Sequence, residues 1–312
     1  MMRRSITPWA LIPTLILPAT GCAAAAVTPT NLARTLQNAR GGETIVLTPG
    51  DYGTVTLPMR QFSPRLTIDA SRARFSQIVM RRVEGVEIRG GNVVGPREQQ
   101  FGIVVDYARD IRIAAMAIRG ARIGVAISRS RQVDVVGNDF AGTRSDGVNV
   151  AGSQNILVER NRCVDFDPIE AVYSPDGKLI TDGDHPDCVQ GWSIKGMPPT
   201  ADVTITDNIA NGFMQGVWFG NPGQGGYDRI IVRNNQFALA AHNGIVLKEA
   251  RDSIVQGNVV RTIKGARMHA YPFKPVTAWI SLTGERNTVC DNKTDFPRFS
   301  MGMARCKVTP GR

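Results

Sequence analysis

Histidine and cysteine are scarce in this chain of 312 residues, which has three histidines and five cysteines. They do not stand at the spacings of a zinc site, and the phosphate-binding glycine-rich loop and the serine-hydrolase elbow are both missing. Aromatic residues make up only 6% of the chain. The basic residues are spread along it, without a basic helix or an aromatic-rich RNA-binding motif. We therefore expect neither zinc chemistry, nor nucleotide chemistry, nor a nucleic-acid partner.

The sequence also lacks an apolar run long enough to span a bilayer as a helix. The short stretch Trp9–Leu17 follows two arginines and precedes a run of small residues, an order typical of an export signal. We predict a signal peptide over residues 1–26 and a periplasmic, outer-membrane-anchored or secreted protein. The segment before Cys22 loosely resembles a lipoprotein cleavage site, so Cys22 is a candidate lipid anchor, and the sequence leaves anchored and free forms open.

Removal of the signal leaves four cysteines, namely Cys163, Cys188, Cys290 and Cys306. An even number of cysteines in an oxidising compartment predicts disulfides. Joining Cys163 to Cys188 and Cys290 to Cys306 closes the shortest loops, but the sequence leaves the pairing open.

The net charge is +10 and the isoelectric point is near 9.8. For an exported monomer, which we expect here, an acidic polysaccharide is the natural polyanionic partner. A basic surface that only keeps the protein soluble is the alternative.

The chain contains an internal repeat whose unit is apolar-x-apolar-x-x-Asn. Its copies end at Asn138, Asn161, Asn208 and Asn235, with weaker copies at Asn258 and Asn292. A second apolar segment recurs in the same register, and its copies begin at Gly102, Gly124, Gly147, Cys188, Gly216, Gly244 and Trp279. The first three of these copies follow one another at about 22 to 23 residues, a period that indicates a solenoid.

Alternation of apolar and polar residues places every second side chain inward. One coil cannot bury its apolar face alone, so coils stack at the strand spacing of about 4.8 Å. Equivalent residues then lie above one another, and the predicted inner ladder is Val125, Val148, Val189, Val217 and Ile245. The asparagines should form a structural ladder at a bend, where their amides bond from coil to coil.

An amphipathic segment over Thr30–Arg40 predicts a short helix that caps the open end of the solenoid. The sequence GGETIVLTPGDY follows it at Gly41–Tyr52. Helix and motif together resemble the N-terminal entry of pectin-lyase-like proteins. The resemblance implies an all-β, right-handed parallel β-helix solenoid with an N-terminal capping helix. We predict this domain over residues 30–295 and a C-terminal cap or tail over 296–312.

The interval between the Asn161 and Asn208 coils doubles to 47 residues, which predicts an insertion at about Asp165–Pro186. Solenoids place function on an outer face and in such insertions. Asp146 and Asp187 should stack on the coils that flank the insertion, followed by Gln215 and Asn243.

The outward positions of this strand are small or aliphatic in the earlier coils and become Asn149, Gln190 and Trp218 in these coils. We predict a single site where these features meet. Trp218 and Trp192 are candidates for stacking on sugar rings. Asn149, Gln190 and Arg144 are candidates for binding a substrate carboxylate. His185, Lys195 and Tyr173 are candidates for exchanging protons with the substrate.

The acidic residues allow two further interpretations. Asp182, Asp184 and Asp187 could provide oxygen ligands for calcium. Alternatively, Asp146 and Asp187 could be the acid and base of a glycoside hydrolase, since like charges that close raise one pKa.

The pectin-lyase-like superfamily includes polysaccharide lyases, hydrolases, epimerases and proteins without enzymatic activity. A lyase acting on a uronate polysaccharide by β-elimination is our first expectation, with His185, Asp187 and Asp146 as catalytic residues. The alternatives are a hydrolase, an epimerase or a carbohydrate-binding surface protein. Ser145–Gly147 and Asp187–Val189 are similar to two motifs of polygalacturonases, but one of the paired aspartates of that family is replaced by Pro186, and the histidine-glycine motif and the Arg-x-Lys partner have no equivalent in place.

Overall fold

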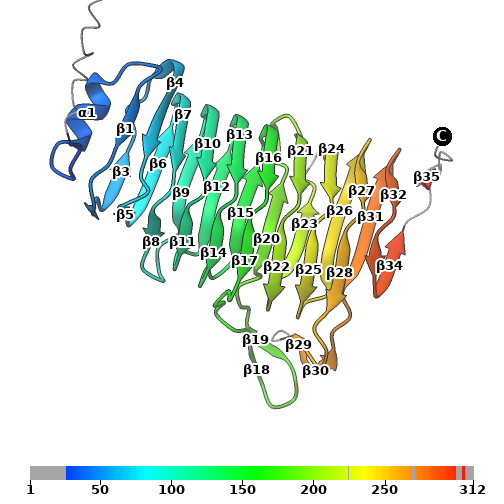
Figure 1. The fold of residues 1–312 in the computed structure, drawn as a ribbon. Coiled ribbons are helices and arrows are strands. Elements are labelled where there is room, and N and C mark those ends of the chain that lie inside the picture. The colour runs from blue at the N-terminus through cyan, green and yellow to red at the C-terminus, as the bar shows by residue number, and fades with distance from the viewer. Residues whose placement is uncertain (1–25, 224, 269–270, 300–303, 306–312) are drawn as a thin grey trace, which may run out of the picture.

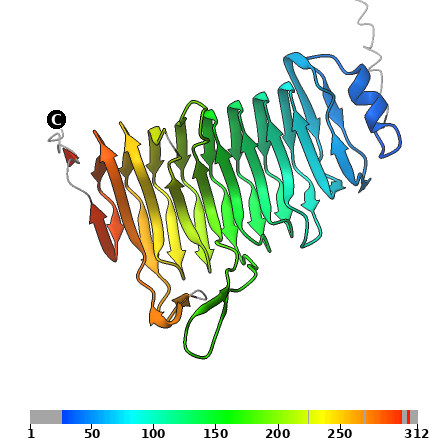
Figure 2. The same ribbon diagram turned by 180° about the vertical axis from the view of Figure 1, so that it is seen from behind.

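The computed structural model describes residues 26–223, 225–268, 271–299 and 304–305. Over these residues the chain winds into a parallel β-helix, whose coils follow one another along a single axis (Figures 1 and 2). Each regular coil contributes one strand to each of three ladders of parallel strands, which we name A, B and C in chain order. Ladders A and C belong to one 21-stranded sheet, and ladder B is a separate ten-stranded sheet.

Ladder A consists of β1 (Thr44–Val46), β4 (Gln61–Asp69), β7 (Glu84–Arg89), β10 (Arg109–Ala114), β13 (Arg131–Val136), β16 (Gln154–Glu159), β21 (Thr200–Thr206), β24 (Tyr227–Arg233), β27 (Ile254–Gln256), β32 (Thr288–Cys290) and β35 (Ala304–Arg305). Ladder B consists of β2 (Gly50–Asp51), β5 (Ala73–Phe75), β8 (Asn92–Val94), β11 (Ala117–Arg119), β14 (Asp139–Ala141), β17 (Arg162–Val164), β22 (Ile209–Gly212), β25 (Gln236–Leu239), β28 (Val259–Thr262) and β33 (Lys293–Thr294). Ladder C consists of β3 (Thr54–Thr56), β6 (Gln77–Arg81), β9 (Phe101–Asp106), β12 (Ile123–Ser128), β15 (Asp146–Ala151), β20 (Asp187–Trp192), β23 (Gln215–Asn221), β26 (Asn243–Arg251), β31 (Trp279–Glu285) and β34 (Phe296–Phe299).

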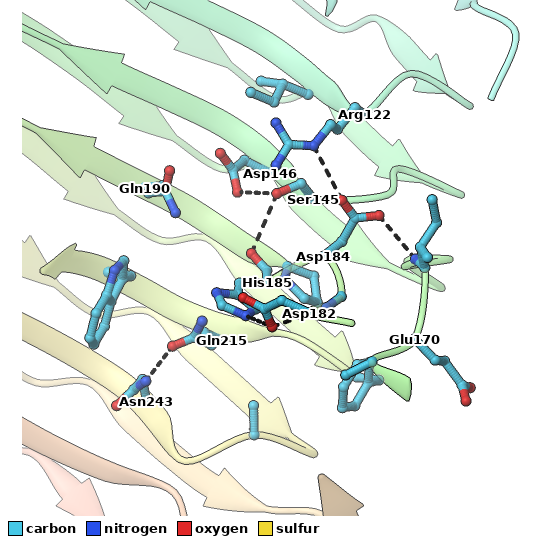
Figure 3. Close-up of a pocket in the computed structure, with 18 of the residues that line it drawn as sticks. Arg122, Ser145, Asp146, Glu170, Asp182, Asp184, His185, Gln190, Gln215 and Asn243 are labelled. Atoms are coloured by element: carbon cyan, nitrogen blue, oxygen red, sulfur yellow. Dashed lines mark hydrogen bonds and ion pairs between the residues drawn. The ribbon is translucent and has the colours of Figure 1, made fainter. Parts of the chain in front are cut away.

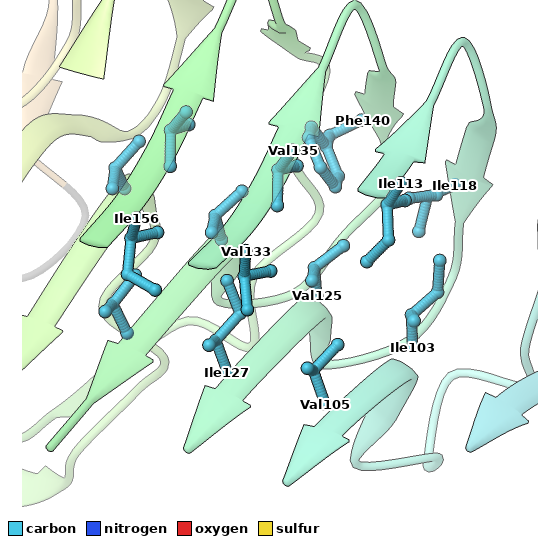
Figure 4. Packing of buried hydrophobic residues seen from close by; sticks show 14 of the residues in the cluster. Ile103, Val105, Ile113, Ile118, Val125, Ile127, Val133, Val135, Phe140 and Ile156 are labelled. Atoms are coloured by element: carbon cyan, nitrogen blue, oxygen red, sulfur yellow. The ribbon is translucent and has the colours of Figure 1, made fainter. Parts of the chain in front are cut away.

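The core is a column of apolar side chains that point inward from all three ladders (Figure 4). The predicted inner ladder is confirmed, because Val125, Val148, Val189, Val217 and Ile245 are consecutive register partners and all are fully buried. Each coil therefore buries its apolar face against the next, as a solenoid requires.

The asparagine ladder lies at the turn between ladders A and B. Asn161 Nδ2 donates to Asn208 Oδ1 at 3.0 Å, and the same oxygen accepts from the Asn161 backbone N–H at 2.9 Å. Asn208 repeats this pattern with Asn235. The chain of amides satisfies the backbone of the turn from coil to coil, so the structural role predicted for these asparagines is confirmed.

The helix α1 (Leu32–Asn38) lies at the N-terminal end of the solenoid, beside β1 (Figure 1). It buries Leu32 and Leu36, which confirms the predicted helix with shorter bounds. At the other end, β34 pairs with β31, so ladder C continues into the segment predicted as a terminal cap. No helix among the described residues is long and apolar enough to cross a membrane.

The predicted insertion is present between β17 and β20. It contains the antiparallel hairpin of β18 (Val172–Tyr173) and β19 (Leu179–Thr181), which projects away from the coils (Figure 1). A second hairpin, β29 (Arg267–Met268) with β30 (Tyr271–Pro275), follows ladder B later in the chain. The predicted signal peptide, except for its last residue Ala26, and the candidate lipid anchor Cys22 lie outside the described residues and stay predictions.

Candidate active site

A pocket of about 680 Å³ lies on the outer face of ladder C, over the middle coils. Its floor comes from β15, β20, β23 and the start of β26, and the insertion forms one side of it (Figure 3). The side chains that line it from the insertion include Ile169, Glu170, Tyr173, Leu179, Asp182 and His185. The insertion therefore converts an open sheet face into a partly enclosed site.

Polar side chains of successive coils stand in register on this floor. Asp146 of β15 pairs in register with Asp187 of β20, and Asp187 pairs with Gln215 of β23. A second row, three residues further along each strand, consists of Asn149, Gln190 and Trp218. Both rows agree with the stacking predicted from the repeat.

The two aspartates are buried as a pair. Asp146 is 1% exposed at the pocket floor, and Asp187 is 0% exposed beside it. Burial raises the pKa of Asp146 to about 7. Burial, and then the charge of Asp146, raise the pKa of Asp187 well above its usual range. Two such carboxyl groups titrate together, and the pair retains at least one proton near neutral pH.

Neighbouring polar groups hold this pair. Asn149 Nδ2 donates to Asp146 Oδ2 at 2.7 Å and to Gln190 Oε1 at 2.7 Å. Gln190 Nε2 donates to Asp187 Oδ2 at 2.7 Å, and Ser145 Oγ donates to Asp146 Oδ1 at 3.1 Å. Asp187 Oδ1 is buried and has no hydrogen-bond partner among the described residues. A proton on this oxygen avoids the cost of a buried, unpaired charge.

His185 lies on the insertion side of the pocket, as Figure 3 shows. Its side chain is 61% exposed, and Nε2 is 3.1 Å from Asp182 Oδ1. Its backbone oxygen accepts a hydrogen bond from Ser145 Oγ at 3.4 Å. The carboxylate of Asp182 thus orients an accessible imidazole next to the aspartate pair.

Asp184 holds the insertion against the coils. Its side chain is 6% exposed, and Arg144 donates to both of its oxygens, from Nε at 2.9 Å and from Nη2 at 3.1 Å. Arg122 Nε donates to it at 3.2 Å, and the Ile169 backbone N–H at 3.0 Å. Despite burial, these donors lower the pKa of Asp184 and keep it ionised.

The aspartates of the insertion do not fit the calcium site suggested by the sequence. Asp184 already accepts from two guanidinium groups, whose positive charges oppose a cation at the same oxygens. Asp182 is directed to His185, and Asp187 is buried behind Gln190. Among the residues that the structure describes, no three acidic, histidine or cysteine side chains form a group that could hold a metal ion.

Two residues predicted to contact substrate lie elsewhere. Arg144 does not line the pocket, because its guanidinium is engaged with Asp184. Lys195 is exposed beyond the end of β20, and it is not part of the pocket lining either. Arg144 lies just before β15, on the coil that precedes the insertion, and its contact with Asp184 of the insertion is one that strand parity alone does not specify.

Trp218 and Trp192 both line the pocket. The indole of Trp218 covers Gly220, where an added Cβ would lie 2.1 Å from Cε2, so the missing side chain lets the ring lie against the strand. Lys248 Nζ is 5.1 Å from the centre of this ring. Trp192 is 41% exposed and donates from Nε1 to Gln190 Oε1. The two rings give neighbouring coils an aromatic surface of the kind that sugars stack on.

The disulfide between Cys163 and Cys188 joins β17 to β20 and closes the base of the insertion. This is one of the two pairings that close the shortest loops. Cys306, which belongs to the other predicted pairing, lies outside the described residues. Since Cys188 is next to Asp187, the bond also fixes the strand that carries the buried aspartate.

The sequence interpretation missed several polar residues of the lining, among them Arg122 and His242. Each directly precedes a ladder C strand, β12 and β26, as Ser145 precedes β15. This shared corner position is a signal in the repeat that could have identified both. The imidazole of His242 stacks on Trp279, with 4.7 Å between ring centres.

A family model described as "Right handed beta helix region" matches residues 76–266. None of the curated proteins matches the chain in sequence.

Among solved structures, the chain is similar to a mannuronic acid specific polysaccharide family 6 lyase from human gut microbiota, with 13% identity and a TM-score of 0.58 over 92% of this chain and 69% of that one. It is also similar to the Dettilon tailspike protein, with 13% identity and a TM-score of 0.51, covering 85% of this chain. The chain spans 57% of the length of that tailspike. At such identities the likeness shows the fold alone.

Proposed function

Because the chain belongs to the right-handed β-helix family, whose fold supports several activities, the site itself has to indicate the reaction, and we propose that this protein is a polysaccharide-cleaving enzyme. Asp146 is the proposed general acid at the glycosidic oxygen. The observation that supports this assignment is the buried aspartate pair on the pocket floor, whose raised pKa values keep a proton available near neutral pH.

Each part of the site has a task in this proposal. The aromatic rings of Trp192 and Trp218 bind the sugar chain in the pocket. Asp146 faces the pocket and protonates the leaving oxygen, while Asp187 behind it shares the remaining proton. His185, oriented by Asp182, accepts a proton from the attacking water on the insertion side.

We favour hydrolysis over β-elimination on the basis of the hydrogen-bond donors. Elimination requires a group that neutralises a uronate carboxylate before its neighbouring proton can leave. The amide N–H groups of Asn149 and Gln190 are directed to the aspartates and to each other. Arg122 lines the pocket but is paired with Asp184. Elimination remains the second candidate, because His185 is an exposed imidazole in the position that a base would need.

One experiment tests the proposal and separates the two reactions. The protein is incubated with a panel of acidic and neutral polysaccharides, and each mixture is assayed for new reducing ends and for the absorbance of an unsaturated product. Hydrolysis gives reducing ends alone, and elimination gives both. Asp146→Asn should lower the rate by roughly 100-fold or more, as expected for a general acid, whereas Asp202→Asn, at a surface ion pair, should leave it unchanged.

Full activity of Asp146→Asn would overturn the assignment of the acid. Retained polysaccharide binding without product on any substrate would show a carbohydrate-binding protein instead of an enzyme.

The disulfide also supports export. Cys163 and Cys188 are bonded in the structure, and such bonds persist mainly in oxidising compartments. We therefore propose that the enzyme acts outside the cytosol, where polysaccharides are accessible.

A further inference from the structure

The turn between ladders C and A carries a cluster of arginines on the coils that precede the pocket. We propose that this cluster is a separate binding site for the anionic groups of an acidic polysaccharide, and that it holds the same chain that enters the pocket. Only the second statement, that the same chain enters the pocket, rests on the proposed function. We call the cluster the arginine edge, and it consists of Arg81, Arg82, Tyr107, Arg109, Arg129 and Arg131.

The centre of the arginine edge is an exposed tyrosine between two guanidinium groups. Arg82, Tyr107 and Arg129 occupy equivalent turn positions of three successive coils, each with its backbone N–H bonded to the coil that follows. The guanidinium carbons lie 6.0 Å and 4.3 Å from the centre of the tyrosine ring. Arg129 Nη1 also donates to the Tyr107 hydroxyl at 3.1 Å. Tyr107 is nevertheless 51% exposed, so the stack presents a ring and cations to solvent.

Only one of the five arginines of this edge has a close carboxylate partner. Arg82 lies over the Tyr107 ring, and the ion pairs found among the described residues of this edge involve neither Arg82 nor Arg131. Arg81 and Arg109 have only 4.0 Å contacts, to Asp106 and Glu84 respectively. Arg129 alone has a close carboxylate, Asp106 at 2.8 Å.

The same turn is neutralised at the other end of the solenoid. There each arginine is hydrogen-bonded to an aspartate of the preceding coil, and the pairs are Arg229 with Asp202, Arg251 with Asp228, and Arg286 with Asp252. After the pocket, each of these arginines is therefore closely paired with an aspartate, whereas before the pocket only Arg129 is. This difference in pairing along the axis distinguishes the arginine edge from the later turns.

A continuous row of outward side chains connects the arginine edge to the pocket. Going from the pocket toward the N-terminus, one coil at a time, Trp192 pairs in register with Ala151. Ala151 pairs with Ser128, and Ser128 pairs with Asp106. The two residues between the ends of the row are small. Three coil steps of about 4.8 Å separate Trp192 from the Tyr107 coil, so a chain of a few sugars would contact both.

Carboxylate or sulfate groups fit this edge better than neutral sugars do. Arginine binds planar anionic groups through paired N–H donors, and unpaired cations at an exposed rim attract a polyanion from a distance. A neutral polysaccharide could accept hydrogen bonds from Arg82 or Arg131 but would lack the attraction between opposite charges. The proposal therefore assigns an acidic polymer as the substrate class of the neighbouring pocket.

The test is a binding measurement that does not depend on turnover. Polygalacturonate and a neutral glucan of similar length are titrated into the full-length protein, the double variant Arg82→Gln/Arg131→Gln, and the control Arg34→Gln/Lys293→Gln. The control removes the same charge from exposed residues of α1 and β33. The edge variant should bind polygalacturonate roughly tenfold more weakly and with a smaller dependence on salt. The control variant and the glucan titrations should be unaffected.

Equal losses in the edge variant and the control would show that net charge alone attracts the polymer and would overturn the site. Unchanged binding in the edge variant would overturn it as well. The same variants in an Asp146→Asn background separate this proposal from the enzymatic one, because binding at the edge persists there even if catalysis is assigned wrongly. If one chain spans both sites, the edge variant should weaken the binding of long polymers more than that of short ones. An equal loss for short and long polymers would contradict the statement that one chain occupies both sites.

Discussion

At the scale of single residues, the site depends on two carboxyl groups that the fold buries side by side. Their juxtaposition follows from the repeat, because Asp146 and Asp187 hold the same position in consecutive coils although 41 residues separate them in the chain. Their protonation depends on burial, which raises the pKa of Asp146 to about 7 from a usual value of 3.8. This shift links the chemistry of the pair to the stability of the protein.

The stability of the protein should fall as the pH rises from about 4 to about 7. In this range the folded pair retains protons that the unfolded chain has released, so folding becomes less favourable with each unit of pH. For Asp146 alone the loss is at most about 4 kcal/mol, at 1.36 kcal/mol per pKa unit. Asp146→Asn/Asp187→Asn removes the titration. Urea unfolding at pH 5 and pH 8 should show a wild-type decline that the double variant lacks.

The surface variant Asp202→Asn serves as the control, since its carboxylate is paired with Arg229 and its pKa is lowered. It should keep the wild-type decline between pH 5 and pH 8. A double variant that declines as steeply as the wild type would contradict the raised pKa values.

Sequence reasoning located the aspartate pair but not the contacts around it. Strand parity and coil length were enough to place Asp146, Asp187 and Gln190 on one wall. They could not show that Gln190 directs its amide to Asp187, or that Asp187 is fully buried. Such contacts depend on side-chain rotamers and on the cover that the insertion provides.

At the scale of elements, the insertion between β17 and β20 decides whether a pocket exists. The repeat predicted its position, because an insertion interrupts a regular period. It did not predict the folded form, in which Arg122 and Arg144 from two earlier coils bind Asp184. These residues are 62 and 40 positions away from Asp184 in the chain, and no periodic pattern relates them. The aspartate expected as a metal ligand therefore serves to position a loop.

Asp184→Asn should release the insertion from the coils without unfolding the β-helix. The change leaves two guanidinium groups without their shared carboxylate, and breaking a buried ion pair costs roughly 3 kcal/mol. Since the disulfide still closes the base of the insertion, the loss should be confined to the residues between Cys163 and Cys188. Hydrogen exchange measured by mass spectrometry should show faster exchange over 168–186 and unchanged exchange in β7–β13.

Asp139→Asn is the matched control, because Asp139 also receives hydrogen bonds from two arginines, Arg119 and Arg162, but lies on ladder B. It should leave exchange in the insertion unchanged. Equal exchange in the insertion of Asp184→Asn and of the wild type would show that the ion pair is not what holds it.

At the scale of the whole molecule, the β-helix is a linear array in which each coil contacts only its neighbours. Its long-range order was predictable because one short pattern, repeated, specifies strand, turn and inward face at once. The asymmetry along the axis was not predictable from that pattern. The pocket, the arginine edge and the paired arginines of the later turns all use outward positions that the core leaves free. The repeat therefore fixes where these positions are, but not which side chains occupy them.

A linear array also predicts how a local defect spreads. Asn208 accepts from the backbone and side chain of Asn161 and donates to Val158 O, Thr206 O and Asn235 Oδ1. Asn208→Ala removes these bonds from the middle of the buried ladder and leaves buried groups on both sides without partners, at a cost of roughly 3 kcal/mol. Because coupling passes only between adjacent coils, the array should then unfold in two steps instead of one.

Denaturant-dependent hydrogen exchange measures this directly. In Asn208→Ala, peptides from β24–β32 should lose protection at a lower denaturant concentration than peptides from β7–β13, since the shorter block of coils has fewer neighbours to stabilise it. Asn292→Ala is the control, because Asn292 stands near the end of the same ladder and, among the described residues, its side chain bonds only to Asn258 and to Val255 O of the preceding coil. Its defect should weaken the last coils and leave the midpoint of β7–β13 unchanged. A uniform shift of every peptide in Asn208→Ala would mean that the coils unfold as one cooperative unit, and that the aspartate pair and the arginine edge are stabilised by the entire solenoid.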